Sequence, residues 1–277
     1  MTVLNSGRIL PKDDPDAVEV VRRRVTAEGI ALHEDIRVLS VARQGNGIAV
    51  VVEADGQERS ITGSHLLVAA GRRANVDGLG LETAGIEYSP RGIKVDARLR
   101  TTNKRVFAVG DVTGGYQFTH AANYHAGIVI RNALFRWPAK ADAAVPWVTY
   151  TDPELAHVGL QASEAEALGH RISVTSFPFA DIDRARAERE TEGFAKIVLG
   201  RRGRGLGATV VGRGAGELIL PWVLAIGQGL KIGAMAGMIA PYPTMSEVSK
   251  RAAGAHYTPK LFSPRTRKVV GLVQRFT

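Results

Sequence analysis

The sequence predicts an α+β protein with short strands and helices. Valines at helical spacing predict a helix from about Asp16 to Glu28. Short β-branched runs between Ile36 and Ile61, separated by glycine-containing turns, predict a β-meander. After Pro146 the strands come first and the helices follow, which predicts an antiparallel sheet covered by helices.

The N-terminal elements follow one another closely. Thr2 to Leu4 is predicted to form a strand, and an acidic turn at Asp13–Asp14–Pro15 precedes the first helix, which Gly29 ends. The meander strands are expected over three ranges, which are 36–42, 47–54 and 58–61.

Two apolar runs in the middle of the chain predict buried strands. Leu66 to Ala70 is closed by Gly71, and Val106 to Val109 is closed by Gly110–Asp111. A helix is expected from Thr119 to Phe135, with small residues on one face.

Beyond Pro146, Ser163 is predicted to cap a short helix, with Glu166 completing a capping box. The turn from Arg201 to Gly205 is expected to join two strands as a hairpin. Strands are predicted over 172–177, 194–199 and 206–211, and helices over 217–229, 232–238 and 244–253.

Composition narrows the functional classes. The formal charge of +9 is spread among acidic residues, and the densest basic group, Arg201, Arg202 and Arg204, has no aromatic neighbour, so nucleic acid is not an expected partner. The chain has no cysteine and therefore no disulfide or thiolate metal site. No metal site, membrane span or signal peptide is predicted, and we expect a cytoplasmic protein.

The strongest local signal runs from Thr101 to Asp111. A carboxylate at the end of a strand, beside a glycine that permits close approach, can accept hydrogen bonds from sugar-type hydroxyls. This segment resembles the second flavin-binding motif of the pyridine nucleotide-disulfide oxidoreductases, which include dihydrolipoamide dehydrogenase and mercuric reductase. The resemblance implies that Gly110 and Asp111 contact the ribityl chain of FAD.

The stretch from Gln117 to Ala122 resembles the helix start that faces the flavin ring in the same family. The resemblance implies cofactor contacts from Phe118, Thr119, His120 and Ala121, whose backbone N–H groups favour negative charge. His120 has two interpretations: a helix-start side chain beside the flavin, or a catalytic base.

Further matches place the domains. Residues 67–73 resemble the family's hinge between nicotinamide and flavin domains, and 145–159 and 212–219 resemble its dimerisation domain. The implied architecture is a pair of partial nucleotide-binding α/β domains followed by an antiparallel-sheet-plus-helices dimerisation domain. Its parts are a remnant of the NAD(P)-binding domain (residues 1–75), the C-terminal half of the FAD-binding domain (residues 76–145) and the dimerisation domain (residues 146–277).

Tyr242 and Glu247 are the candidate catalytic residues. Most family members carry His where Tyr242 stands, paired with an acid that matches Glu247, and Tyr at this position resembles mercuric reductase. A tyrosine with a pKa of about 10 transfers protons poorly near neutral pH. Two interpretations stay open: a role in the acceptor site, or a buried tyrosine whose hydroxyl bonds Glu247.

The resemblance implies an FAD-dependent NAD(P)H oxidoreductase that acts on a disulfide or a related acceptor and forms a homodimer. The redox cysteine pair and the glycine-rich dinucleotide fingerprints lie upstream of this segment in the family, so we expect the chain alone to be inactive and to bind cofactors weakly. The alternative is a non-catalytic dimerisation module. The residues decide neither the acceptor nor the choice between NADH and NADPH, and they leave open whether Met1 is a natural start.

Overall fold

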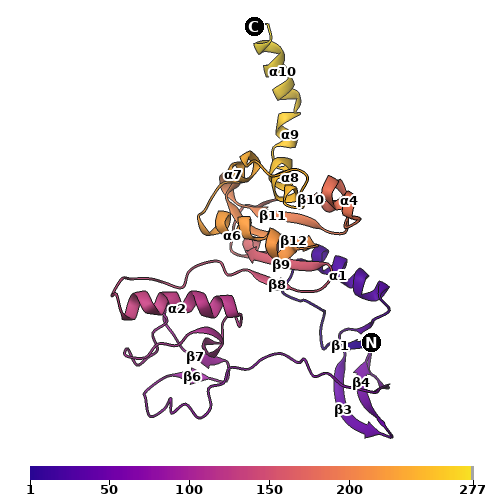
Figure 1. Ribbon diagram of the computed structural model, residues 1–277, viewed down its shortest axis with the longest axis vertical. Helices are drawn as coiled ribbons and strands as arrows, with labels where there is room; N and C mark the ends of the chain where they lie inside the picture. Colours follow the sequence, from indigo (N-terminus) through magenta and orange to yellow (C-terminus); the bar gives the residue numbers. More distant parts are fainter. Residues whose placement is uncertain (276–277) are drawn as a thin grey trace. The chain divides into compact units, whose positions relative to one another are not determined.

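The computed structural model describes residues 1–275, so the last two residues of the predicted dimerisation domain lie outside the described range. The chain forms two compact units. Unit 1 comprises residues 1–66 and 146–275, and unit 2 comprises residues 67–145. Figure 1 shows mixed helices and strands, and the α+β prediction is confirmed.

The N-terminal part of unit 1 is a small β–α–β element followed by a meander. Strand β1 (Thr2–Leu4) pairs in parallel with β2 (Ala31–His33), and helix α1 (Pro15–Ala27) connects them. The meander is antiparallel and consists of β3 (Arg37–Gln44), β4 (Gly47–Ala54) and β5 (Gln57–Gly63). The helix and the meander agree with their predictions.

The main sheet of unit 1 has five antiparallel strands in the order β10-β11-β12-β9-β8. The strands are β8 (Trp147–Thr149), β9 (Glu154–Gly159), β10 (Ser173–Pro178), β11 (Phe194–Leu199) and β12 (Gly205–Gly212). Strands β11 and β12 form the predicted hairpin, whose turn contains the 3₁₀ helix η3 (Arg201–Gly203).

Helices pack on this sheet, and Figure 1 shows several of them beside it. Those in contact with its strands include α5 (Ala215–Leu218), α6 (Leu220–Gly227) and α8 (Glu247–Ala255). The same region also contains α3 (Ala162–Ala167), α4 (Asp183–Glu188), which follows the 3₁₀ helix η2 (Phe179–Asp181), and α7 (Ile232–Gly237), which packs on α8. Two further helices, α9 (Thr258–Leu261) and α10 (Pro264–Val273), follow α8.

Helix α1 buries one face against the main sheet. Ala17, Val18 and Val21 form a core cluster with Leu155 of β9 and Val211 of β12. The helix begins where Asp14 accepts hydrogen bonds from the amides of Asp16 and Ala17. The acidic turn and the valine periodicity therefore direct α1 onto the sheet.

Unit 2 has little regular structure apart from one long helix. It contains β6 (Tyr88–Ser89), β7 (Gly92–Ile93), the 3₁₀ helix η1 (Gly110–Thr113) and α2 (Thr119–Ala133). One core cluster gathers Ala74, Val76, Leu81, Ile86, Ile93 and Ala108, and a second gathers Leu99, Ile128 and Ala139.

Both predicted buried strands of the middle region are wrong. Residues 66–70 form no strand, and Leu67 and Val68 are 88% and 75% exposed. In the second run only Phe107 makes a β-bridge, to Arg100. Neither run pairs with a full neighbouring strand within residues 1–275, and an apolar run cannot form a sheet without such a partner.

Three helix predictions also differ from the structure, and one of them is the start of α8, which lies at Glu247 and not at Thr244. The capping box of α3 is formed by Gln161 and Glu164, not by Ser163 and Glu166. The helix expected over 217–229 divides into α5 and α6 near Pro221, because proline lacks the N–H that would continue the hydrogen-bond ladder.

Candidate functional site

Gly110 and Asp111 begin η1 in unit 2, and we call residues 110–114 the flavin-type loop because of the motif that they resemble. Gly110 is buried with φ +69°, and a Cβ at this position would lie 2.9 Å from Ala122 Cβ of α2. Its amide donates to His125 Nδ1 at 3.2 Å, and its carbonyl accepts from the Thr113 hydroxyl at 2.8 Å. Only glycine allows η1 to approach α2 this closely.

The Asp111 side chain is exposed. Within residues 1–275 its carboxylate makes no hydrogen bond and no ion pair, although its backbone carbonyl accepts from the amide of Gly114. An exposed carboxylate on a backbone fixed from both sides is suited to accept hydrogen bonds from a ligand.

A short hairpin supports this loop. Gly114 has φ +71°, and a Cβ there would lie 1.9 Å from the carbonyl oxygen of Arg91, so the backbone that joins β6 to β7 presses directly on the end of η1. Any side chain at this position would separate the hairpin from the loop. Gly114 therefore allows the hairpin to hold the end of the loop that carries Asp111 in place.

The start of α2 presents the other predicted cofactor contacts. Phe118 is the N-cap residue in an extended conformation, and no side chain caps the helix. Thr119 and His120 are exposed, and Ala121 is buried against the unit. Because helix N-termini attract negative charge, this end can accept an anionic or electron-rich group.

The His120 ring stacks on Phe118, with centroids 5.2 Å apart and planes 8° apart. The segment before the helix is also tied to the hinge motif, because Arg72 donates to the carbonyl of Gln117 at 2.9 Å. The structure thus brings Gly110, Phe118 and Arg72 into one unit.

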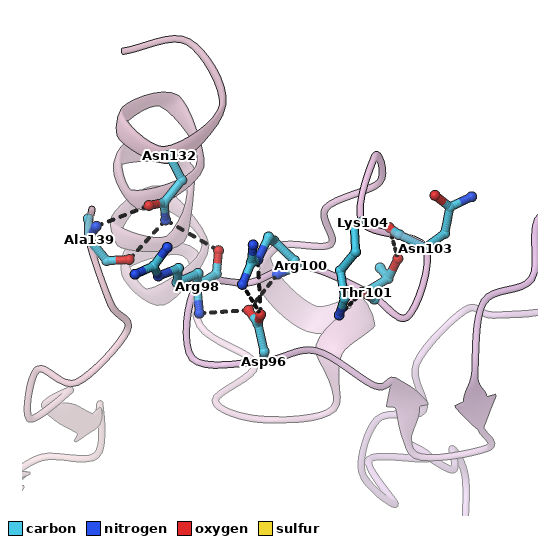
Figure 2. Close-up of polar contacts among 8 residues, drawn as sticks. All are labelled: Asp96, Arg98, Arg100, Thr101, Asn103, Lys104, Asn132 and Ala139. Atoms are coloured by element: carbon cyan, nitrogen blue, oxygen red, sulfur yellow. Dashed lines mark hydrogen bonds and ion pairs between the residues drawn. The ribbon is translucent and has the colours of Figure 1, made fainter. Parts of the chain in front are cut away.

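Figure 2 shows a polar framework around the segment from Asp96 to Lys104, which precedes η1 in the chain. Asp96 accepts from the amides of Arg98 and Arg100 and from the Arg100 guanidinium, at 2.8 to 3.0 Å. Burial raises the pKa of Asp96, but these hydrogen bonds outweigh it and hold that pKa below its usual value.

Asn132 completes the framework from α2. Its amide donates to the carbonyl of Ala139 at 2.8 Å and accepts from the amide of Ala139 at 3.0 Å, and it also approaches the carbonyl of Arg98 at 3.4 Å (Figure 2). Sequence reasoning missed Asp96 and Asn132. The sequence signal for Asp96 is an aspartate followed by two arginines within four residues, a pattern typical of a turn.

The candidate catalytic pair lies in unit 1. Tyr242 is 69% exposed, and its hydroxyl donates to Asp183 Oδ2 of α4 at 3.1 Å. This hydrogen bond raises the pKa of Tyr242. The interpretation of a buried tyrosine bonded to Glu247 is therefore wrong. Glu247 is the first residue of α8, where the helix dipole favours its charge, and it makes no hydrogen bond to Tyr242.

Among residues 1–275, no group of three or more His, Asp or Glu side chains is arranged to hold a metal ion. No helix in the same range has both the length and the apolar character needed to cross a membrane.

Two family models match the chain. The model of the pyridine nucleotide-disulphide oxidoreductases matches residues 1–126, and the model of their dimerisation domain matches residues 145–253. The two matches together account for most of the sequence.

Curated relatives agree with these models. The chain is 36% identical to a mercuric reductase of Staphylococcus aureus over 251 residues, which cover 90% of this chain and 46% of that protein. It is 34% identical to a dihydrolipoyl dehydrogenase of Bacillus subtilis over 258 residues, which cover 91% of this chain and 55% of that protein. The chain thus spans about half the length of these relatives.

Solved structures give the same result. LpdA from Mycobacterium tuberculosis superposes with a TM-score of 0.85 at 32% identity, covering 91% of this chain and 55% of that one. The HOCl-induced flavoprotein disulfide reductase RclA from Escherichia coli superposes with a TM-score of 0.82 at 28% identity, covering 91% of this chain and 58% of that one. The chain therefore belongs to the pyridine nucleotide-disulphide oxidoreductase family and carries its dimerisation domain.

Proposed function

We propose that this chain is the C-terminal portion of an FAD-dependent NAD(P)H oxidoreductase similar to mercuric reductase and dihydrolipoyl dehydrogenase. The observation that supports this most directly is the exposed, unpartnered Asp111 carboxylate, on a loop fixed beside the uncapped start of α2. The named relatives and the flavoprotein RclA support the same activity class.

The residues fit FAD at this loop. Asp111 would accept hydrogen bonds from ribityl hydroxyls, while Gly110 keeps the backbone close to α2. The start of α2, from Phe118 to Ala121, would orient the flavin ring through backbone N–H groups. Bound FAD supplies hydride acceptance from NAD(P)H and onward electron transfer.

Tyr242 and Glu247 are proposed to serve the acceptor site of the intact enzyme. The Tyr242 hydroxyl is exposed and can orient a bound acceptor, such as a disulfide or a related group, while Glu247 adds a negative charge at the start of α8. The printed sequence contains no cysteine, so its own residues supply no redox dithiol. We therefore propose that this chain alone does not turn over.

A homodimer is the proposed assembly. On α6, Trp222 and Ala225 are buried, but Leu220 and Leu224 are 65% and 63% exposed. Two exposed leucines one helical turn apart are suited to pack against a twofold mate. This surface also supports the alternative function, a dimerisation module without catalysis. The absence of nucleic-acid and membrane partners and the cytoplasmic location stay predictions.

An NAD(P)H oxidation assay tests the proposal. The chain is mixed with excess FAD, NADH or NADPH, and an acceptor, either lipoamide or Hg²⁺ with a thiol. We expect no turnover with any combination. Flavin fluorescence in the same mixtures should reveal weak FAD binding that Asp111→Ala reduces and Asp142→Ala does not. Equal binding by the two variants would remove Asp111 from the site.

A further inference from the structure

A recess lies in unit 1, at one end of the main sheet. It has a volume of about 580 Å³ and lies between two connections. Gly169, His170 and Arg171 lead from α3 into β10, and Gly200, Arg201 and Arg204 belong to the turn between β11 and β12. These connections are adjacent because Ser173 of β10 pairs with Leu199 of β11.

The recess is strongly basic. Three arginines and one histidine line it, and no acidic residue does. The sequence contains no Asp or Glu over 167–180 or over 193–216, so neither connection supplies a neutralising charge. The side chains of Arg171, Arg201 and Arg204 make no hydrogen bond or ion pair in the part of the chain that the structure describes.

The backbone of the turn is held in place. The amide of Gly200 donates to the carbonyl of Arg204 at 2.8 Å, and Arg204 forms a β-bridge with Lys231. A Cβ at Gly229 would lie 3.4 Å from Arg204 Nη2, so the guanidinium packs over a glycine that leaves it room. Leu206 packs on Gly200 and contributes an apolar wall.

From these observations we infer that the recess binds a small anion carrying at least two phosphate groups. Arginine guanidinium groups bind phosphate oxygens through paired N–H donors, and three of them converge from both connections. The volume falls in the range of small-molecule sites, about 300 to 1,000 Å³. The lining residues include no Phe, Tyr or Trp, so we expect the phosphate chain and not a nucleobase to be recognised.

The site does not depend on the proposed function, because every residue that forms it lies between positions 169 and 206, outside the flavin-type loop. A ligand there can alter the sheet end of the dimerisation domain without touching Asp111 or Tyr242.

Isothermal titration calorimetry with sodium tripolyphosphate, at constant ionic strength, tests the inference. Arg204→Gln and Arg171→Gln remove one lining guanidinium each, from opposite sides of the recess. Arg202→Gln is the matched control, because Arg202 lies in the same turn but does not line the recess. All three variants lose the same charge.

We expect one site per chain in the wild type, unchanged affinity in Arg202→Gln, and affinities about tenfold weaker in Arg204→Gln and Arg171→Gln. An affinity for ATP within a few-fold of that for tripolyphosphate supports recognition of the phosphate chain. Equal weakening in all three variants would show diffuse charge attraction and overturn the site, as would the absence of binding to wild type. Binding of ATP but not tripolyphosphate would overturn the assigned ligand class.

Discussion

Lys196 of β11 reaches Asp14 at the start of α1, with Lys196 Nζ 2.8 Å from Asp14 Oδ2. The same ammonium group lies 2.7 Å from Asp16 Oδ2. Burial lowers the pKa of Lys196, but the hydrogen bonds with Asp14 and Asp16 outweigh it and raise that pKa above its usual value. Because Asp14 also caps α1, one lysine secures the N-terminal helix to the main sheet.

Replacing this lysine should loosen α1. In Lys196→Met the Asp14 carboxylate keeps its buried position and loses its counter-charge, so we expect a loss of about 2 kcal/mol in the free energy of unfolding. Urea denaturation measures it. The control is Lys94→Met, which breaks the exposed ion pair with Glu87 and should cost less. Similar losses in both variants would show that the buried pair has no special role.

His157 makes the stability depend on pH. Its Nε2 lies 3.1 Å from the carbonyl of Gly159, which only accepts, so Nε2 carries the proton and Nδ1 accepts from the Thr209 hydroxyl at 2.8 Å and the Gln161 amide at 3.3 Å. Burial lowers the pKa of His157. The folded state therefore holds this ring neutral, while the unfolded chain binds a proton near pH 6.5.

The sign follows from this difference in proton binding. As pH falls below about 6.5 toward the lowered folded pKa, the unfolded state binds more protons and the folded state loses stability. Urea denaturation at about pH 7.5 and about pH 5.5 measures how far the free energy of unfolding falls on acidification. The decrease should be larger in wild type than in His157→Gln. An equal decrease in the free energy of unfolding in both proteins would mean that other groups cause it.

Gly110→Ala should disrupt the flavin-type loop. The new Cβ would lie 2.9 Å from Ala122 Cβ at a φ of +69°, so both the contact and the conformation are unfavourable. We expect a loss of about 1 to 3 kcal/mol and weaker FAD binding. Gly115→Ala is the control, because its Cβ would have 4.0 Å to the nearest atom. Equal melting temperatures for the two variants would contradict the role given to Gly110.

These elements show where sequence reasoning succeeds. The α1 helix follows from valine spacing and an acidic cap, and the meander follows from glycine turns, because both signals are local. Most strands of the main sheet were predicted within one or two residues for the same reason.

The failures concern what a segment contacts. Leu67 and Val68 have the composition of a buried strand, but burial needs a neighbouring strand that the local sequence does not reveal. A bond between Tyr242 and Glu247 was one of two interpretations that the family resemblance left open, whereas the hydroxyl donates to Asp183, which is 59 residues away. In the polar framework, the Asn132 amide likewise donates to the carbonyl of Arg98, which is 34 residues away and is brought close only by the fold.

Tyr242 has a specific test in a protein rebuilt with an upstream flavin and dithiol half. Tyr242→Phe removes only the hydroxyl that is proposed to orient the acceptor, so it should lower the rate of electron transfer to the acceptor and leave flavin reduction by NAD(P)H unchanged. Stopped-flow absorbance separates these two steps. Tyr150→Phe, at an 82% exposed tyrosine, is the control. Equal acceptor rates for Tyr242→Phe and wild type would remove the hydroxyl from the mechanism.

Sedimentation velocity, recorded in both the protein and the flavin absorption bands, tests the central claim most directly. A dimerisation domain joined to the proposed half of a flavin site should sediment as a homodimer that carries much less than one FAD per chain, because Asp111 and the start of α2 are proposed to supply only part of the cofactor's contacts. A folded monomer, or a dimer that retains one tightly bound FAD per chain, would contradict the account.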